Sequence, residues 1–111
     1  EAERRPFLDN LAEQRDAAAA RDDKRFTTAD AMFHRALAVR YGNREMLAML
    51  DRLQDIIRLT ALNVLHKDDQ RIHVSMRDHE AIFESICNKD GDQARQRMLE
   101  HLEFGKRILI L

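Results

Sequence analysis

Apolar residues recur along this chain at the alternating three- and four-residue steps of amphipathic helices. Four interruptions divide it into five stretches of helical length, and they fall at residues 22–24, 42–43, 67–69 and 88–92. Because one face of a helix repeats about every 3.6 residues, the pattern predicts helices along the whole chain. The third stretch, from Arg44 to His66, is apolar on most sides, which favours a central helix or one that serves two interfaces.

Glycines mark two of these interruptions. Gly42 is expected to end a helix in left-handed backbone, and Asn43 is expected to accept from the free amides of the next helix. By the same reasoning, Gly91 is predicted to close one helix and Asp92 to cap another. Three Gly and one Pro among 111 residues agree with an all-α fold, and a chain of this length encloses one core. We therefore predict a single all-α domain over residues 1–111.

Charge and cysteine content exclude several classes of protein. The 19 basic and 20 acidic residues are interleaved, so that no phosphate-binding surface is predicted. The single Cys87 cannot form an internal disulfide and is expected to pack at a helix end, which fits a reducing cytoplasm. Because no apolar run approaches the roughly 20 residues that a membrane-spanning helix needs, no membrane partner is expected.

Polar residues interrupt three of the apolar stripes. Asp30 and His34 share a stripe and stand four residues apart, so their Cβ atoms should lie about 5 to 6 Å apart on one helix face. His79 and His101 each occupy the middle of a stripe on a later helix. These stripes are Phe26, Asp30, Phe33, His34, Leu37 and Tyr41; Ile72, Met76, His79, Phe83 and Ile86; and Ala94, Met98, His101, Gly105 and Ile108.

Three imidazoles and one carboxylate form a donor set typical of one divalent ion. Zinc is favoured, and nickel, iron or manganese would also fit, whereas calcium sites are richer in oxygen. A single histidine on an apolar stripe is more often an ordinary core residue. An Asp30–His34 hydrogen bond without metal would satisfy that pair, but it leaves His79 and His101 unexplained. His66 lies at a helix end and His73 lies off the apolar stripe, so both are expected to be exposed.

Four elements of the sequence together resemble the C-terminal effector (FCD) domain of FadR-type regulators in the GntR family. They are Asp30-Ala-Met-Phe-His34, Gly42-Asn43, Asp78-His79-Glu80-Ala-Ile-Phe and Met98-Leu-Glu-His101-Leu, and the resemblance covers about residues 7–109. It implies an antiparallel bundle of five to six helices whose central cavity holds a metal on Asp30, His34, His79 and His101. It also implies a small carboxylate metabolite as effector and a homodimer. The resemblance implies that operator DNA is contacted through an N-terminal winged-helix domain, and we expect this domain and the first effector-domain helix to lie outside the sequence.

Arg58 is the candidate for a second contact to the effector, because a guanidinium can clamp a carboxylate with two hydrogen bonds. An ion pair with Asp55, three residues earlier, is the simpler alternative. The predicted function is metal-dependent effector sensing and dimerisation in a transcription regulator, without catalysis.

Two other classes of function stay open. One is a small metal-dependent hydrolase or lyase, for which Asp78 and Glu80 are the nearest general bases. They are expected to point away from the ion, because neighbouring helix positions differ by about 100°. The other is a purely structural helical dimerisation module.

Overall fold

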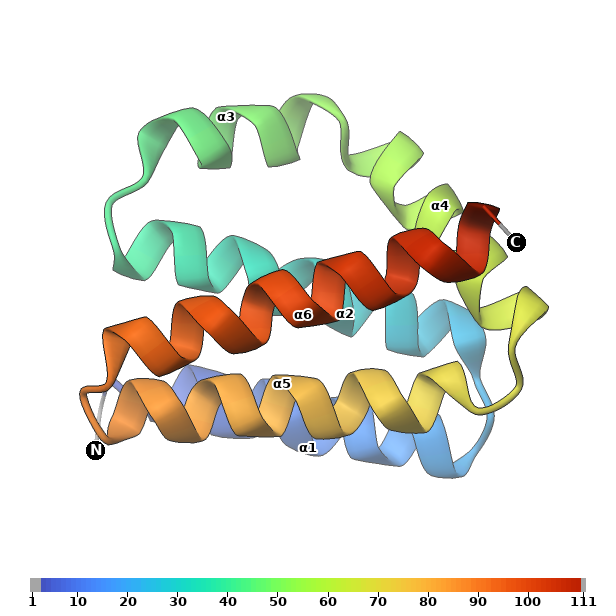
Figure 1. Cartoon of the computed structure of the whole chain (residues 1–111), viewed down its shortest axis with the longest axis horizontal. Helices are drawn as coiled ribbons and strands as arrows, with labels where there is room; N and C mark the ends of the chain where they lie inside the picture. Colours follow the sequence, from blue (N-terminus) through green and yellow to red (C-terminus); the bar gives the residue numbers. More distant parts are fainter. Residues whose placement is uncertain (1–2, 111) are drawn as a thin grey trace. The chain divides into compact units, whose positions relative to one another are not determined.

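The computed structural model describes the backbone of residues 3–110 and their side chains except those of Met46, Leu102 and residues 105–110. Six helices and no strand occupy this part of the chain (Figure 1), which confirms the all-α class. The helices are α1 (Arg5–Ala19), α2 (Asp23–Arg40), α3 (Arg44–Arg52), α4 (Gln54–Lys67), α5 (Arg71–Cys87) and α6 (Gly91–Ile110). The chain divides within α4 into two compact units, one ending at Leu62 and the other beginning at Asn63. The predicted stripe positions Gly105 and Ile108 lie outside the described side chains.

The first unit is built on the hairpin of α1 and α2. Asp22 caps α2 by accepting a hydrogen bond from the Arg25 amide at 3.1 Å. The rings of Phe7 and Phe33 meet edge to face with their centroids 6.3 Å apart, and Phe33 is fully buried. Asn10 on α1 donates to the Ala29 carbonyl on α2 at 2.9 Å, which adds a polar tie beside the aromatic pair. These contacts fix the face of α2 that carries Asp30.

The third stretch, which the sequence predicts as one helix, consists of the two helices α3 and α4. The chain bends at Leu53, between α3 and α4, and changes direction there (Figure 1). Backbone hydrogen bonding continues through the bend: the Leu53 amide donates to the Met49 carbonyl, and the Leu53 carbonyl accepts from the Ile57 amide. Neither Gly nor Pro marks the position. The direction of α3 is set instead by its packing on α2, which includes an ion pair of Arg35 with Asp51 at 2.8 Å. That tertiary contact is not visible in the local sequence.

One of the two predicted glycine caps is confirmed and the other is wrong. Gly42 has φ +63° and follows α2, as predicted. Between α5 and α6, however, the left-handed residue is Lys89 with φ 59°, and Gly91 is the first residue of α6. The carboxylate of Asp90, rather than Asp92, accepts from the Gln93 amide at 3.0 Å. Because Asp90 supplies this cap in place of Asp92, α6 begins two residues earlier than predicted.

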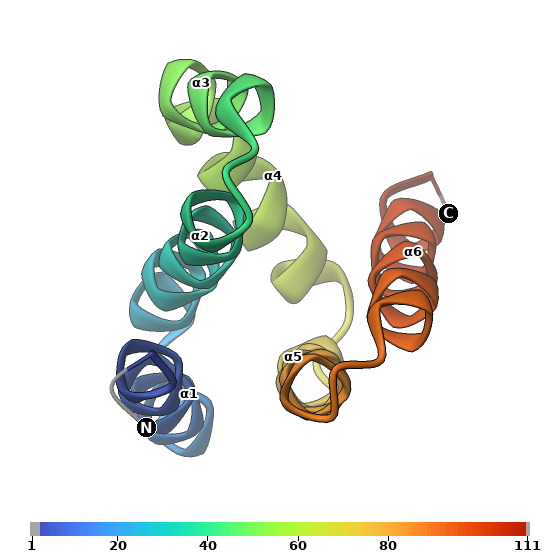
Figure 2. The same cartoon turned by 90° about the vertical axis from the view of Figure 1, so that its left-hand side faces the viewer.

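The second unit contains the last residues of α4 and the hairpin of α5 and α6, which Figure 2 shows nearly end-on. The predicted stripe of α5 is buried at Ile72, Met76, His79 and Phe83. A second stripe on α5 also lies against neighbours and carries the buried Arg71, Ser75, Ile82 and Ser85. Among the described residues, no helix is long and apolar enough to cross a membrane.

Candidate metal centre

Asp30 and His34 form the first pair of potential metal ligands, one turn apart on α2. His34 Nε2 lies 3.2 Å from Asp30 Oδ1, and both side chains are about four-fifths buried. Burial of the ring opposes the charged imidazolium, but the charge of Asp30 and its hydrogen bond outweigh this effect and raise the pKa of His34. The i, i+4 spacing thus does what the sequence predicts, and places a carboxylate and an imidazole in contact on one helix face.

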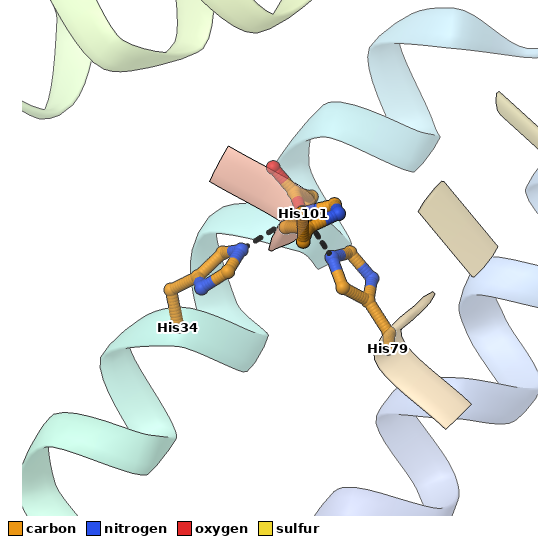
Figure 3. A group of neighbouring side chains, drawn as sticks. His34, His79 and His101 are labelled. Atoms are coloured by element: carbon orange, nitrogen blue, oxygen red, sulfur yellow. Dashed lines mark hydrogen bonds and ion pairs between the residues drawn. The ribbon is translucent and has the colours of Figure 1, made fainter. Parts of the chain in front are cut away.

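His79 on α5 and His101 on α6 form the second pair. Their Nε2 atoms lie 3.3 Å apart, and the ring centroids are separated by 4.8 Å (Figure 3). His79 is fully buried and His101 is 6% exposed. Two histidines from different helices therefore turn the same ring nitrogen toward each other inside the second unit.

The spacing within each pair fits a shared metal ion. Two ligand atoms at about 2.0 to 2.1 Å from a tetrahedral ion lie about 3.3 to 3.4 Å from each other. The Asp30–His34 separation of 3.2 Å and the His79–His101 separation of 3.3 Å both agree with that value. Each unit thus presents two of the four predicted ligands at a ligand-to-ligand distance. The residues present fit a nitrogen-rich divalent site.

Asp78 is a participant that the sequence reasoning missed. Its Oδ2 atom lies 2.7 Å from Nδ1 of His101, and its side chain is 32% exposed. The sequence predicts Asp78 only as a candidate general base that points away from the ion. The signal that could have found it is the second stripe of α5, because Asp78 stands three residues after Ser75 and four before Ile82. Arg71 on that stripe and Asp78 both contact His101 of α6.

Arg71 is the other missed residue beside His101. Its Nη2 atom lies 3.2 Å from the His101 carbonyl oxygen and 3.3 Å from Nδ1 of the same residue. The guanidinium also lies over the ring of Phe104, 5.0 Å from the centroid, and Arg71 is only 4% exposed. Arg71 therefore holds the backbone of α6 at the position of the candidate ligand.

The remaining sequence candidates occupy plainer surroundings. Arg58 is exposed, and its Nη2 atom donates to the hydroxyl of Thr28 on α2 at 3.2 Å, within the first unit. His66 and His73 are exposed, as predicted. Cys87 is a half-buried free thiol at the end of α5. The contact to Thr28 places the Arg58 guanidinium beside α2, two residues before Asp30.

Comparison with known proteins places the chain in a family. The family model described as "FCD domain" matches residues 1–104. A protein of Bacillus subtilis (strain 168), described as "Uncharacterized HTH-type transcriptional regulator YdhC", is 26% identical over 80 residues. The alignment covers 72% of this chain and 35% of that protein, so the chain spans about a third of the relative's length. No solved structure matches the chain. Because the family model covers nearly all of it, the chain belongs to the FCD domain family.

Proposed function

We propose that this chain is the ligand-sensing domain of a transcription regulator and that Asp30, His34, His79 and His101 hold one divalent metal ion. The observation that carries the proposal is the spacing of the two ligand pairs, 3.2 Å on α2 and 3.3 Å between α5 and α6. Both match the edge of a tetrahedral site. The proposal requires the two pairs to bind the same ion, and this requirement is tested by metal stoichiometry and by the metal affinity of variants in each pair.

The donor set favours zinc, with nickel, iron or manganese as further candidates, because it offers three imidazole nitrogens and one carboxylate oxygen. When bound, the ion would supply a Lewis-acid centre for an oxygen of a small carboxylate metabolite. Arg58 is proposed to contact a second carboxylate of that metabolite, since a guanidinium binds carboxylates with two parallel hydrogen bonds. Its position beside Thr28 supports this role.

Control of DNA binding would be exerted in a longer protein. The Bacillus subtilis relative is described as an HTH-type transcriptional regulator, and this chain matches about a third of it. We propose that the effector changes the relative stability of two arrangements of a homodimer, and that a DNA-binding domain outside this chain carries the change to the operator. The effector is then a signal that is bound and released unchanged.

The decisive experiment measures metal stoichiometry and affinity in the 111-residue chain and in matched variants. Metal content is determined by mass spectrometry, and affinity for Zn²⁺ by competition with a chromogenic chelator. We expect one ion per chain, and a large loss of affinity in both His34→Ala and His79→Ala. His73→Ala, which removes an exposed histidine from α5, is the control and should bind as the parent does.

Several outcomes would contradict the proposal. Two ions per chain would mean that the two pairs bind separately. Unchanged affinity in His34→Ala or His79→Ala would remove that residue from the site. Absence of any bound metal, with thermal melting that does not respond to chelators, would return the four residues to ordinary packing and favour a structural module. Turnover of an organic acid by the metal-loaded chain would favour a hydrolase or lyase instead.

The effector class is tested with the metal-loaded chain and a panel of di- and tricarboxylates, by calorimetry. Binding should require the metal, so the chelated chain is the first control. Arg58→Gln should weaken binding of dicarboxylates while leaving metal affinity unchanged, because Arg58 is not among the proposed metal ligands. Equal binding by Arg58→Gln and the parent would show that Arg58 is only a surface residue of α4.

A further inference from the structure

We infer that Asp78 is a positioning residue that holds His101 in the tautomer with its proton on Nδ1, so that Nε2 carries the lone pair needed by a metal. The inference rests on the proposed function only in assigning the Nε2 lone pair to a metal ion. The tautomer itself follows from contacts inside the second unit. Asp78 binds no metal in this scheme and acts only through His101.

The hydrogen-bonding capacities of the groups determine the tautomer. An ionised carboxylate can only accept, and Asp78 Oδ2 lies 2.7 Å from His101 Nδ1, a short distance typical of a bond to a charged acceptor. Nδ1 must therefore be the nitrogen that donates. In a neutral imidazole the other nitrogen then has no proton, and Nε2 of His101 is the atom that faces His79 at 3.3 Å.

Arg71 does not compete for this nitrogen. A guanidinium can only donate, so it could bond to Nδ1 only if Nδ1 were unprotonated. Its Nη2 atom lies 3.3 Å from Nδ1, compared with 2.7 Å for Asp78, and the same Nη2 lies 3.2 Å from the His101 carbonyl oxygen. The carbonyl is thus the acceptor for Arg71. Arg71 fixes the backbone of His101, and Asp78 fixes its ring.

Two consecutive residues of α5, Asp78 and His79, contact the two ring nitrogens of His101 on α6. His79 lies against Nε2 of His101, and Asp78 contacts Nδ1. Because neighbouring helical positions differ by about 100°, the two side chains can reach opposite edges of the same imidazole. Asp78 also lines a pocket between α5 and α6, together with Arg97, Glu100 and Phe104. The Asp78 side chain is 32% exposed at this pocket.

A carboxylate behind a ligating histidine does three things. It selects the tautomer, fixes the plane of the ring and makes the ligating nitrogen more basic. Loss of such a partner typically lowers metal affinity by about 10- to 100-fold. A simple stabilising ion pair between Asp78 and His101 would instead affect melting without selecting which nitrogen is protonated.

The test uses the metal-free 111-residue chain and reads the tautomer of His101 from its ring ¹⁵N resonances, assigned by their loss in His101→Gln. In the parent, Nδ1 should be the protonated nitrogen. Asp78→Asn keeps an oxygen that can accept but adds an NH2 group that can donate to an unprotonated Nδ1, so it should weaken the preference for a proton on Nδ1. Asp78→Leu removes the acceptor and should give a mixture of tautomers. Glu84→Gln, which removes an exposed carboxylate from the same helix, is the matched control and should behave as the parent.

Affinity for Zn²⁺ is then measured in the same variants. Asp78→Leu should lose about 10- to 100-fold, and Asp78→Asn should fall between Asp78→Leu and the parent. A proton on Nε2 in the parent, or an unchanged tautomer in Asp78→Leu, would overturn the inference. A parent that shows the expected tautomer but binds no metal would contradict the proposed function and still support the assignment of the tautomer to Asp78.

Discussion

The Nε2 atoms of His79 and His101 lie 3.3 Å apart although the two residues belong to different helices and stand 22 positions apart in the chain. Neither helix brings them together by itself. Their approach depends on the packing of α5 on α6, on the Asp78 carboxylate behind His101 and on the hold of Arg71 on the His101 backbone. This pair is therefore a sensitive point at which to test the site.

Removal of His79 should weaken binding of the metal and of the effector, and should abolish the stabilisation that the metal gives to the folded chain. We expect His79→Ala to reduce Zn²⁺ affinity and carboxylate binding together, because the proposed effector site includes the ion. Chelation should lower the melting temperature of the parent and leave that of His79→Ala nearly unchanged, since a ligand that binds only the folded state stabilises it. Melting with and without chelator checks this expectation. An equal response of both proteins would contradict it.

Alanine should destabilise the chain at Gly42 but not at Gly91. Gly42 has φ +63°, where a Cβ atom is strained, so Gly42→Ala should lower the free energy of unfolding by about 1 to 2 kcal/mol. Gly91 is the first residue of α6 and has open space around it, so Gly91→Ala should be neutral or stabilising by less than about 1 kcal/mol. Urea denaturation of both variants measures the difference. Equal destabilisation by the two would refute the assignment of Gly91 to the helix.

Phe33 should be a main contributor to the α1–α2 hairpin. It is fully buried and meets Phe7 edge to face, so Phe33→Ala should lower the free energy of unfolding by about 3 to 5 kcal/mol. Met32, the preceding residue, is 61% exposed, and Met32→Ala is the matched control with a much smaller effect. Denaturant unfolding followed by circular dichroism checks both. A small effect at Phe33 would mean that the hairpin does not depend on this aromatic contact.

The ion pair between Arg35 and Asp51 should contribute to stability only where Asp51 is ionised. The hydrogen bond from Arg35 lowers the pKa of Asp51 from its usual value of 3.8, and the charge of Arg35 acts in the same direction. A carboxyl whose pKa is lowered by folding stabilises the folded chain above that usual value and loses this effect as the pH falls through the lowered pKa.

We therefore expect the parent to melt above Asp51→Asn at neutral pH, and the gap to close in strong acid. Because the pair is exposed, the gap should be small and should shrink with added salt. A gap that widens toward acid would contradict the assigned sign.

The sequence by itself determined that the described chain is helical and that Asp30 contacts His34. It also determined the burial of two stripe positions on α2 and four on α5, which are Phe26, Phe33, Ile72, Met76, His79 and Phe83. All of these follow from the fixed period of the helix, which places residues four apart on one face whatever the rest of the chain does. The exposure of His73 was predictable for the same reason, because it lies off the apolar stripe, and that of His66 because it lies at a helix end.

Only the tertiary structure decided the bend at Leu53, the cap at Asp90, the contact of Arg58 with Thr28 and the contact of Asp78 with His101. The bend and the two side-chain contacts depend on how one helix is rotated against its neighbour. The cap depends on which of several adjacent polar residues has its side chain in position to accept a hydrogen bond from a free backbone amide. A helical period fixes directions around one axis, and it leaves open which partner each direction meets.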